Sequence, residues 1–215
     1  MKITAICGWA ISPAWFGELV EKKFPNAKVK ALYPSRPCDP QEARDLLREN
    51  KADLYIGHSL GSLWLLHHRQ FLPFASRKAL LAPILSFNRE NKMGGKIPSG
   101  QLKYLIKMLT RMNGDSNPLD IFFKLCNIPP DSEMTREVPD SSILISGLEF
   151  LDHVSVTGEV TNDFIAIIGD NDPFVDSGEL RRHIPQLEIL RDTGHAPEQL
   201  VEKLSQCTKT MIGSE

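Results

Sequence analysis

The chain has 215 residues, of which 41% are hydrophobic and 24% charged, and its formal net charge is −2. This composition is that of an ordinary globular protein with one sizeable core, and the weak charge argues against nucleic acid as the main partner. No apolar run approaches the roughly 20 residues that a membrane span needs, and the first residues are strand-like rather than a signal peptide.

The cysteines are scattered and form no C-x-x-C pair. They are Cys7, Cys38, Cys126 and Cys207. A structural zinc site is therefore not expected, and we predict no cofactor and a reduced, cytoplasmic setting. We expect a monomer or a weak dimer.

Short apolar runs, several of them ending at glycine or proline, mark the predicted strands in chain order. They cover residues 3–7, 28–33, 53–56, 78–82, 163–169 and 187–190. Helical patterns cover residues 40–49, 62–70 and 197–207, and the first of them begins with Asp39-Pro40, a capping residue and a first-turn proline. Strands that alternate with helices predict an α/β fold with a mostly parallel sheet and right-handed crossovers.

The stretch from 84 to 158 breaks this alternation because it lacks strong strand signals. Its predicted helices cover residues 101–112, 118–125 and 141–150. We therefore predict a mainly helical cap, residues 84–158, inserted into a core made of residues 1–83 and 159–215.

The pentapeptide Gly57-His58-Ser59-Leu60-Gly61 matches G-x-S-x-G between a predicted strand and a predicted helix. That is the context of a nucleophile elbow, in which a serine sits in a strained turn that only glycine-sized neighbours tolerate. The following helix directs its N–H groups at negative charge that forms beside the serine. A plain strand-to-helix turn is the alternative, since the pentapeptide also occurs by chance.

A nucleophilic serine needs a base, and the base needs an acid that orients it. In sheets of this kind the expected chain order is Ser59, then the acid, then the histidine. Asp172 is favoured as the acid because it lies three residues past Gly169, clear of the strand. Asp170 competes with it, but it directly follows the strand and is expected to hydrogen-bond the turn. His195, on the loop after the last strand, is the predicted base.

Only His195 among the six histidines fits both the order and the position. The others are His58, His67, His68, His153 and His183. We expect His58 to pack beneath the elbow and His153 to lie on the cap surface, with a substrate contact as the alternative for His153.

The reaction also needs two N–H groups that hold the negative oxygen of the intermediate. The predicted donors are the backbone N–H groups of Leu60, after the nucleophile, and of Trp9, on the loop after the first strand. The Trp9 indole is then expected to wall the pocket; an ordinary core aromatic is the alternative.

These motifs resemble the α/β-hydrolase superfamily of serine hydrolases, and more narrowly the pimeloyl-[acyl-carrier protein] methyl ester carboxylesterases of biotin synthesis. Residues 7–12 and Trp15 resemble that family's H-G-W-G-L-N…W stretch, and residues 169–175 and 194–197 resemble its acid loop and its H-A-P loop. The resemblance implies a serine carboxylesterase for a short to medium acyl ester of that type. Cys7 departs from the family, standing where histidine is usual, and the N-terminal hairpin common in these enzymes is expected to be absent.

The predicted cap carries a row of basic residues that indicates the charge of the partner. Lys103, Lys107 and Arg111, here called the basic stripe, are four residues apart and so follow one another along a helix. A basic stripe at the mouth of an esterase suits an acidic acyl carrier protein or an anionic substrate. A solvated helix face is the alternative.

Other functions are compatible with the same residues. The triad also supports acyl transfer and the hydrolysis of thioesters or amides. A non-catalytic, hydrolase-like binding protein is the alternative from another class, and the presence of serine, aspartate and histidine together argues against it.

Overall fold

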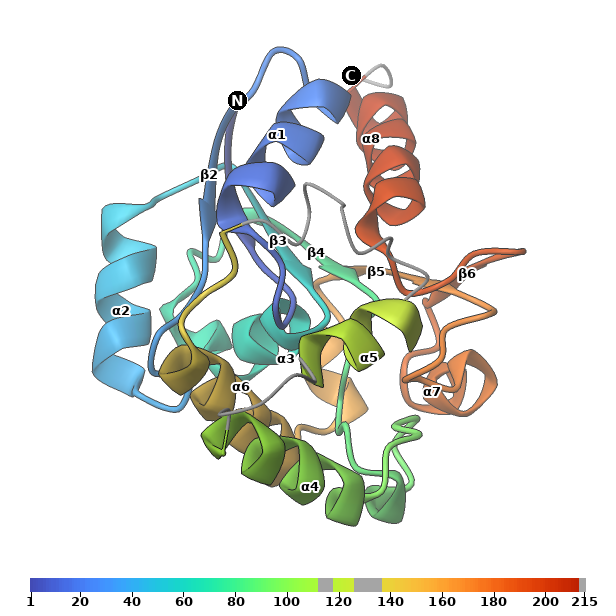
Figure 1. Ribbon diagram of the computed structural model, residues 1–215. Helices are drawn as coiled ribbons and strands as arrows, with labels where there is room; N and C mark the ends of the chain where they lie inside the picture. The colour runs from blue at the N-terminus through green and yellow to red at the C-terminus, as the bar shows by residue number, and fades with distance from the viewer. Residues whose placement is uncertain (112–117, 126–136, 213–215) are drawn as a thin grey trace.

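A parallel sheet forms the centre of the molecule. The computed structural model describes residues 1–111, 118–125 and 137–212. The strands are β1 (Lys2–Ile6), β2 (Lys28–Leu32), β3 (Leu54–His58), β4 (Arg77–Leu81), β5 (Ile165–Gly169) and β6 (Glu188–Leu190). They pair in the order β2-β1-β3-β4-β5-β6 (Figure 1), and every pairing is parallel. This confirms the predicted α/β class with a parallel sheet.

Helices cover both faces of the sheet. They are α1 (Pro13–Lys23), α2 (Pro40–Glu49), α3 (Leu60–His67), α7 (Ser177–His183) and α8 (Pro197–Ile212). The chain moves from β1 outward to β2 and then back past β1 to β3, so right-handed crossovers place α1 and α2 on opposite faces. Figure 1 shows α1 and α8 side by side, and the two helices contact each other. Burial on both faces explains why β3 is buried at every position.

Helix starts follow local capping chemistry. The Asp39 side chain accepts hydrogen bonds from the first turn of α2, and Pro40 is the first helical residue, as predicted. Helix α1 also begins with a capping residue followed by proline, Ser12-Pro13. The Ser12 side chain accepts a hydrogen bond from Trp15 N at 3.3 Å. Helix α1 is not among the predicted helices, although Ser12-Pro13 carries the signal of a helix start.

The helix after the elbow differs from its prediction over residues 62–70. It begins at Leu60 and ends at His67, and a short 3-10 turn, Arg69–Phe71, follows. It begins earlier because Ser59 itself makes the turn, with a φ of 53°, so the next residue is already helical.

Three helices lie together near the carboxyl ends of the strands (Figure 1). They are α4 (Ser99–Thr110), α5 (Pro118–Leu125) and α6 (Ser141–His153), and α4 packs against both of the others. The predicted end of the first of them, Met112, lies outside the described residues. The division into a core and a cap at these boundaries stays a prediction, and the word cap denotes the predicted segment 84–158. In the described part of the chain, no helix has the length and apolar character needed to cross a bilayer.

Candidate active site

Ser59 occupies a sharp turn between β3 and α3. Its φ of 53° and ψ of −115° lie in a region that non-glycine residues rarely adopt. A Cβ added to Gly57 would lie 2.5 Å from the carbonyl oxygen of Gly61, and one added to Gly61 would collide with the carbonyl oxygen of Ile6. Close packing therefore requires both glycines of the G-x-S-x-G motif, and the pentapeptide forms the predicted turn.

Three side chains from three strand ends meet at this turn. Ser59 follows β3, Asp172 lies beyond β5 and His195 lies beyond β6. His195 Nε2 lies 2.8 Å from Ser59 Oγ, and His195 Nδ1 lies 2.6 Å from Asp172 Oδ2. His195 is 3% exposed and Asp172 is 1% exposed, so water hardly competes for these contacts. The structure thus brings together the three residues that the sequence singles out.

The environment of Asp172 favours its charged form. Its Oδ1 accepts hydrogen bonds from the N–H groups of Phe174 (2.8 Å) and Val175 (3.0 Å). Burial alone would raise the pKa of the Asp172 carboxyl, but the charge and hydrogen bond of His195 and these two N–H groups outweigh burial and lower the pKa. The carboxylate is therefore ionised at neutral pH and can stabilise an imidazolium at His195.

The acid loop, residues 169–175, is held by hydrogen bonds from two sides. Asp170 Oδ1 accepts a hydrogen bond from Thr193 N at 3.4 Å, which ties the acid loop to the loop that carries the histidine. From the cap segment, Lys96 Nζ donates to the backbone carbonyl of Asp172 at 2.6 Å. Asp170 thus contacts the turn backbone rather than His195.

No other histidine takes part in the side-chain contacts that join Ser59, His195 and Asp172. His153 is exposed on α6, as expected for a surface residue of the cap. His58 is buried next to the elbow, and its ring centroid lies 5.2 Å from that of His195.

The predicted oxyanion donors flank the elbow in sequence and structure. Leu60 is the first residue of α3, so its N–H has no acceptor within the helix. Among the described residues, neither this N–H nor that of Trp9 donates a hydrogen bond. The Trp9 indole Nε1 donates to Leu144 O of α6 at 2.8 Å, and this contact holds the ring in the wall of the site. Donation to an oxyanion by the two backbone groups stays a prediction.

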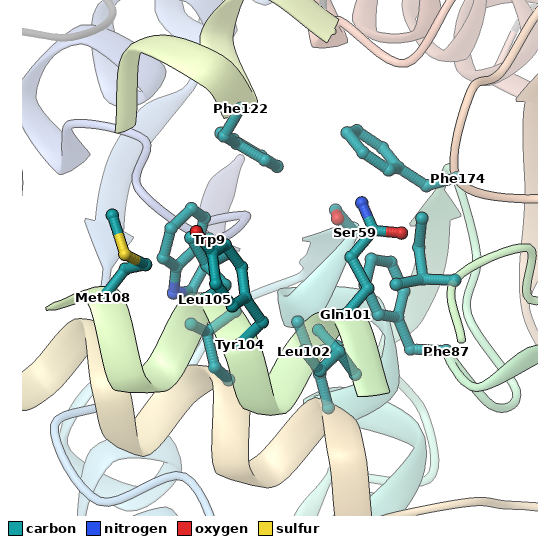
Figure 2. Close-up of a pocket in the computed structure, with 13 residues that line it drawn as sticks. Trp9, Ser59, Phe87, Gln101, Leu102, Tyr104, Leu105, Met108, Phe122 and Phe174 are labelled. Carbon is teal, nitrogen blue, oxygen red and sulfur yellow. The ribbon is translucent and has the colours of Figure 1, made fainter. Parts of the chain in front are cut away.

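A cavity of about 190 Å³ opens beside Ser59 between the sheet and α4, α5 and α6 (Figure 2). No charged side chain is among the described residues that line it. The polar groups in the wall belong to Ser59, Gln101 and Tyr104, together with the indole N–H of Trp9 that is bonded to α6. Figure 2 shows the Gln101 side chain extending from α4 into the same space as Ser59. The cavity suits an apolar group whose orientation is set by a few polar contacts.

Aromatic rings connect this cavity to the candidate triad. The Phe174 ring lies edge-on to the His195 ring at 4.8 Å and stacks on Phe122 of α5 at 5.3 Å. Phe122 in turn meets Trp9 edge-on at 4.7 Å. Apolar rings therefore shield His195 from solvent on the cap side.

A second, much smaller cavity of about 10 Å³ also borders Ser59. Its lining includes His195, His58, Ile11 and Pro197. Its volume is about that of the space one water molecule requires. Ser59 thus has a large apolar space on the cap side and a small space on the side of His195.

The basic stripe does not line the large cavity. Lys103, Lys107 and Arg111 are exposed, whereas the cavity residues of α4 include Leu102 and Leu105. At 100° per residue, Lys103 and Lys107 point away from the cavity-facing side of the helix. Lys103 and Lys107 therefore lie on the outer surface of α4, beside the cavity rather than in it, whereas Arg111 follows the last helical residue, Thr110, so the helix does not carry the whole stripe as predicted.

Among the described residues, no group of three or more His, Cys, Asp or Glu side chains could hold a metal ion.

No protein-family model and no curated protein matches the sequence. Solved structures do match. A lipase-esterase related protein from Clostridium acetobutylicum is 14% identical over 97% of this chain and 93% of its own, with a TM-score of 0.66. A thermophilic esterase from Thermogutta terrifontis is 10% identical over 100% and 90%, also at 0.66. BioG from Haemophilus influenzae is 12% identical over 90% and 88%, at 0.57. At such identities the similarity establishes the fold, and the chain has the α/β-hydrolase fold.

The cap-side wall of the site was not predicted. Leu102 and Leu105 lie within the helix predicted over residues 101–112, but a helical pattern does not distinguish core packing from a ligand cavity. Gln101 and Phe122 carried no signal of their own. Lys96 acts through a main-chain carbonyl, which no side-chain pattern reveals.

Proposed function

We propose that the protein is a serine carboxylesterase that hydrolyses a short to medium acyl ester. The observation that supports this proposal is the hydrogen-bonded chain Ser59–His195–Asp172, which is buried and borders an apolar cavity. Asp172 orients His195, and His195 is placed to take the proton of Ser59.

In this proposal Ser59 Oγ attacks the carbonyl carbon of the ester while His195 Nε2 accepts the hydroxyl proton. The negative oxygen that forms is held by the N–H groups of Leu60 and Trp9. When the C–O bond breaks, His195 returns the proton to the departing alcohol and an acyl-Ser59 ester remains. A water molecule activated by His195 then releases the carboxylic acid and restores Ser59.

The two cavities support an assignment of the substrate's two halves. The leaving alcohol must lie next to the proton donor, and the small cavity is the one lined by His195. The large cavity then takes the acyl group. A 150 Å³ cavity in another protein holds benzene, so about 190 Å³ accommodates roughly seven or eight heavy atoms. The substrate is thus an apolar acyl ester of a small alcohol.

The finer proposal is that an acyl carrier protein presents the acyl group, as in pimeloyl-carrier methyl esters. It rests on the family resemblance of the motifs and on the exposed basic stripe beside the cavity, which complements an acidic partner. A small alcohol site also fits a methyl ester better than it fits a thioester whose leaving group is a whole carrier. We propose a cytoplasmic location for this reaction.

Replacing Ser59 by alanine tests the proposed function. With the methyl ester of an unbranched seven-carbon acid, Ser59→Ala should lower kcat by at least about 10³-fold while near-UV circular dichroism stays unchanged. Ser142→Ala, at an exposed serine of α6, is the matched control and should retain activity. A fluorophosphonate should label the wild type and the control but not Ser59→Ala. Unchanged hydrolysis by Ser59→Ala would rule out the proposed nucleophile, and a folded wild type that is neither labelled nor active would favour a binding protein.

A further inference from the structure

His58, between Gly57 and the candidate nucleophile, makes a contact that the proposed reaction does not use. Its Nε2 lies 2.9 Å from the main-chain carbonyl oxygen of His195. A carbonyl oxygen only accepts hydrogen bonds, so the His58 ring must carry its proton on Nε2 and donate it there. The side chain is 1% exposed, and thus one buried histidine holds the backbone of the other.

The surroundings of His58 leave little freedom for the ring. It packs against Phe16 of α1, with ring centroids 5.9 Å apart. A Cβ added to Gly8 would lie only 2.6 Å from His58 Nδ1, so the loop after β1 also closes on the ring. His58 is therefore the point where that loop, the elbow and the His195 loop meet.

Burial alone does not explain a histidine at this position. Its Nδ1 is buried and has no hydrogen-bond partner among the described residues. An unsatisfied buried polar atom lowers the free energy of unfolding by about 1–3 kcal/mol, so an apolar side chain of similar size would make the fold more stable. What an apolar side chain lacks is the Nε2 donor. Local rules of packing are broken most often where a site needs a particular group.

His58 is neutral, which is compatible with its position beside the proposed catalytic base, His195. Burial, reinforced by the nearby His195, lowers the pKa of His58 to about 3. His58 therefore stays neutral at physiological pH and keeps one N–H donor. A neutral ring adds no repulsion when His195 becomes an imidazolium.

We propose that His58 is a positioning residue, which fixes the main chain of His195 so that its ring reaches Ser59 and Asp172 together. The inference rests on the proposed function for its kinetic consequence, while its structural content concerns the His58–His195 contact alone. A displacement of about 1 Å in such a site lowers rates by about 10²-fold.

A matched pair of amide substitutions tests the proposal. In His58→Gln the side-chain amide extends far enough to replace the Nε2 donor, whereas in His58→Asn the same group is one carbon too short. His68 offers a control outside the site, because it is also 1% exposed and its Nε2 lies 2.9 Å from Pro37 O. His68 follows the last residue of α3, about 12 Å along the helix from the elbow. The control variant is His68→Asn.

We expect His58→Asn to lower kcat by at least about 30-fold with KM changed less than about threefold, and His58→Gln to recover most of the loss. His68→Asn should lower thermal stability to a similar extent as His58→Asn but leave kcat of the folded protein unchanged. Equal losses in His58→Gln and His58→Asn, or an equal kcat loss in His68→Asn, would assign His58 a merely structural role.

Nuclear magnetic resonance tests the contact without any turnover. The proton between His195 Nδ1 and Asp172 should give a low-field resonance in the wild type and His58→Gln that is lost or shifted in His58→Asn. In ¹⁵N-histidine-labelled wild type, His58 should be the Nε2–H tautomer; the Nδ1–H tautomer would overturn the inference even if no variant folds. The proposed function and this inference can fail separately. If only the proposed function is wrong, the wild type is inactive and is not labelled by the fluorophosphonate, but His58 is still the Nε2–H tautomer.

Discussion

Two aspartates two residues apart differ in the groups that their carboxylates contact. Asp172 contacts His195, whereas Asp170 contacts the backbone of Thr193. Asp172→Asn should therefore lower kcat for the ester by about 10³- to 10⁴-fold, because an amide neither selects the required tautomer of His195 nor stabilises its charge. Asp170→Asn keeps the acceptor oxygen and should stay within about threefold of the wild type. Steady-state kinetics of the two variants checks this, and a larger loss in Asp170→Asn would reverse the assignment.

The strand–elbow–helix element depends on its glycines for packing. A Cβ at Gly61 would meet the backbone carbonyls of Ile6 and Cys7, which belong to β1 and the residue after it and cannot easily move. Gly61→Ala should therefore destabilise the fold by several kcal/mol, within the range of severe packing defects. Gly100→Ala, on α4, is the matched control. Apart from the adjoining backbone of α4, no heavy atom would lie within 4 Å of the added Cβ. That change should be neutral or stabilise by up to about 1 kcal/mol. Thermal melting of both variants gives the comparison, and equal melting temperatures would contradict the packing argument.

At the level of α4, the exposed basic stripe is the proposed docking surface. Reversing two of its charges, Lys103→Glu with Lys107→Glu, should lower kcat/KM for a carrier-bound ester about tenfold or more and reduce its salt dependence. The same variant should hydrolyse a p-nitrophenyl ester at the wild-type rate, because neither lysine lines the cavity. Equal effects on both substrates would exclude docking, and no effect on either would identify the stripe as a solvated helix face.

The stability of the whole molecule should depend on pH through its buried histidines. The pKa of His58 falls from 6.5 to about 3 on folding, so below pH 6.5 the unfolded chain binds a proton that the folded chain does not. Stability therefore decreases as the pH falls from 6.5 towards 3, with a slope from this residue of up to about 1.4 kcal/mol per pH unit. The pKa of Asp172 is lowered on folding as well, so the stability that this carboxylate contributes is complete above its ordinary pKa of 3.8 and is lost as the pH falls below that value.

Urea unfolding at pH 7, 6, 5 and 4 measures this dependence. His58→Gln removes the ionisable ring and should flatten the slope below pH 6.5. Part of the slope should remain, because burial also lowers the pKa of His67 and His68. Identical slopes in the wild type and His58→Gln would show that His58 does not resist protonation in the folded protein.

Local patterns in the sequence determined the α/β class, the strands and the candidate triad. Alternating elements specify a parallel sheet, whose strand ends meet at one edge, so Ser59, Asp172 and His195 could be grouped from their order along the chain. Capping signals placed the start of α2 for the same local reason.

Only the tertiary structure decided the shape of the site. The two unequal cavities, the aromatic path through Phe174 and Phe122, and the outward direction of the basic stripe all depend on how the cap helices pack on the sheet. Main-chain contacts were likewise hidden, because His58 and Lys96 act on carbonyl oxygens far away in sequence. Periodicity along a chain records which face of an element is buried, whereas what covers that face is set by contacts between distant segments.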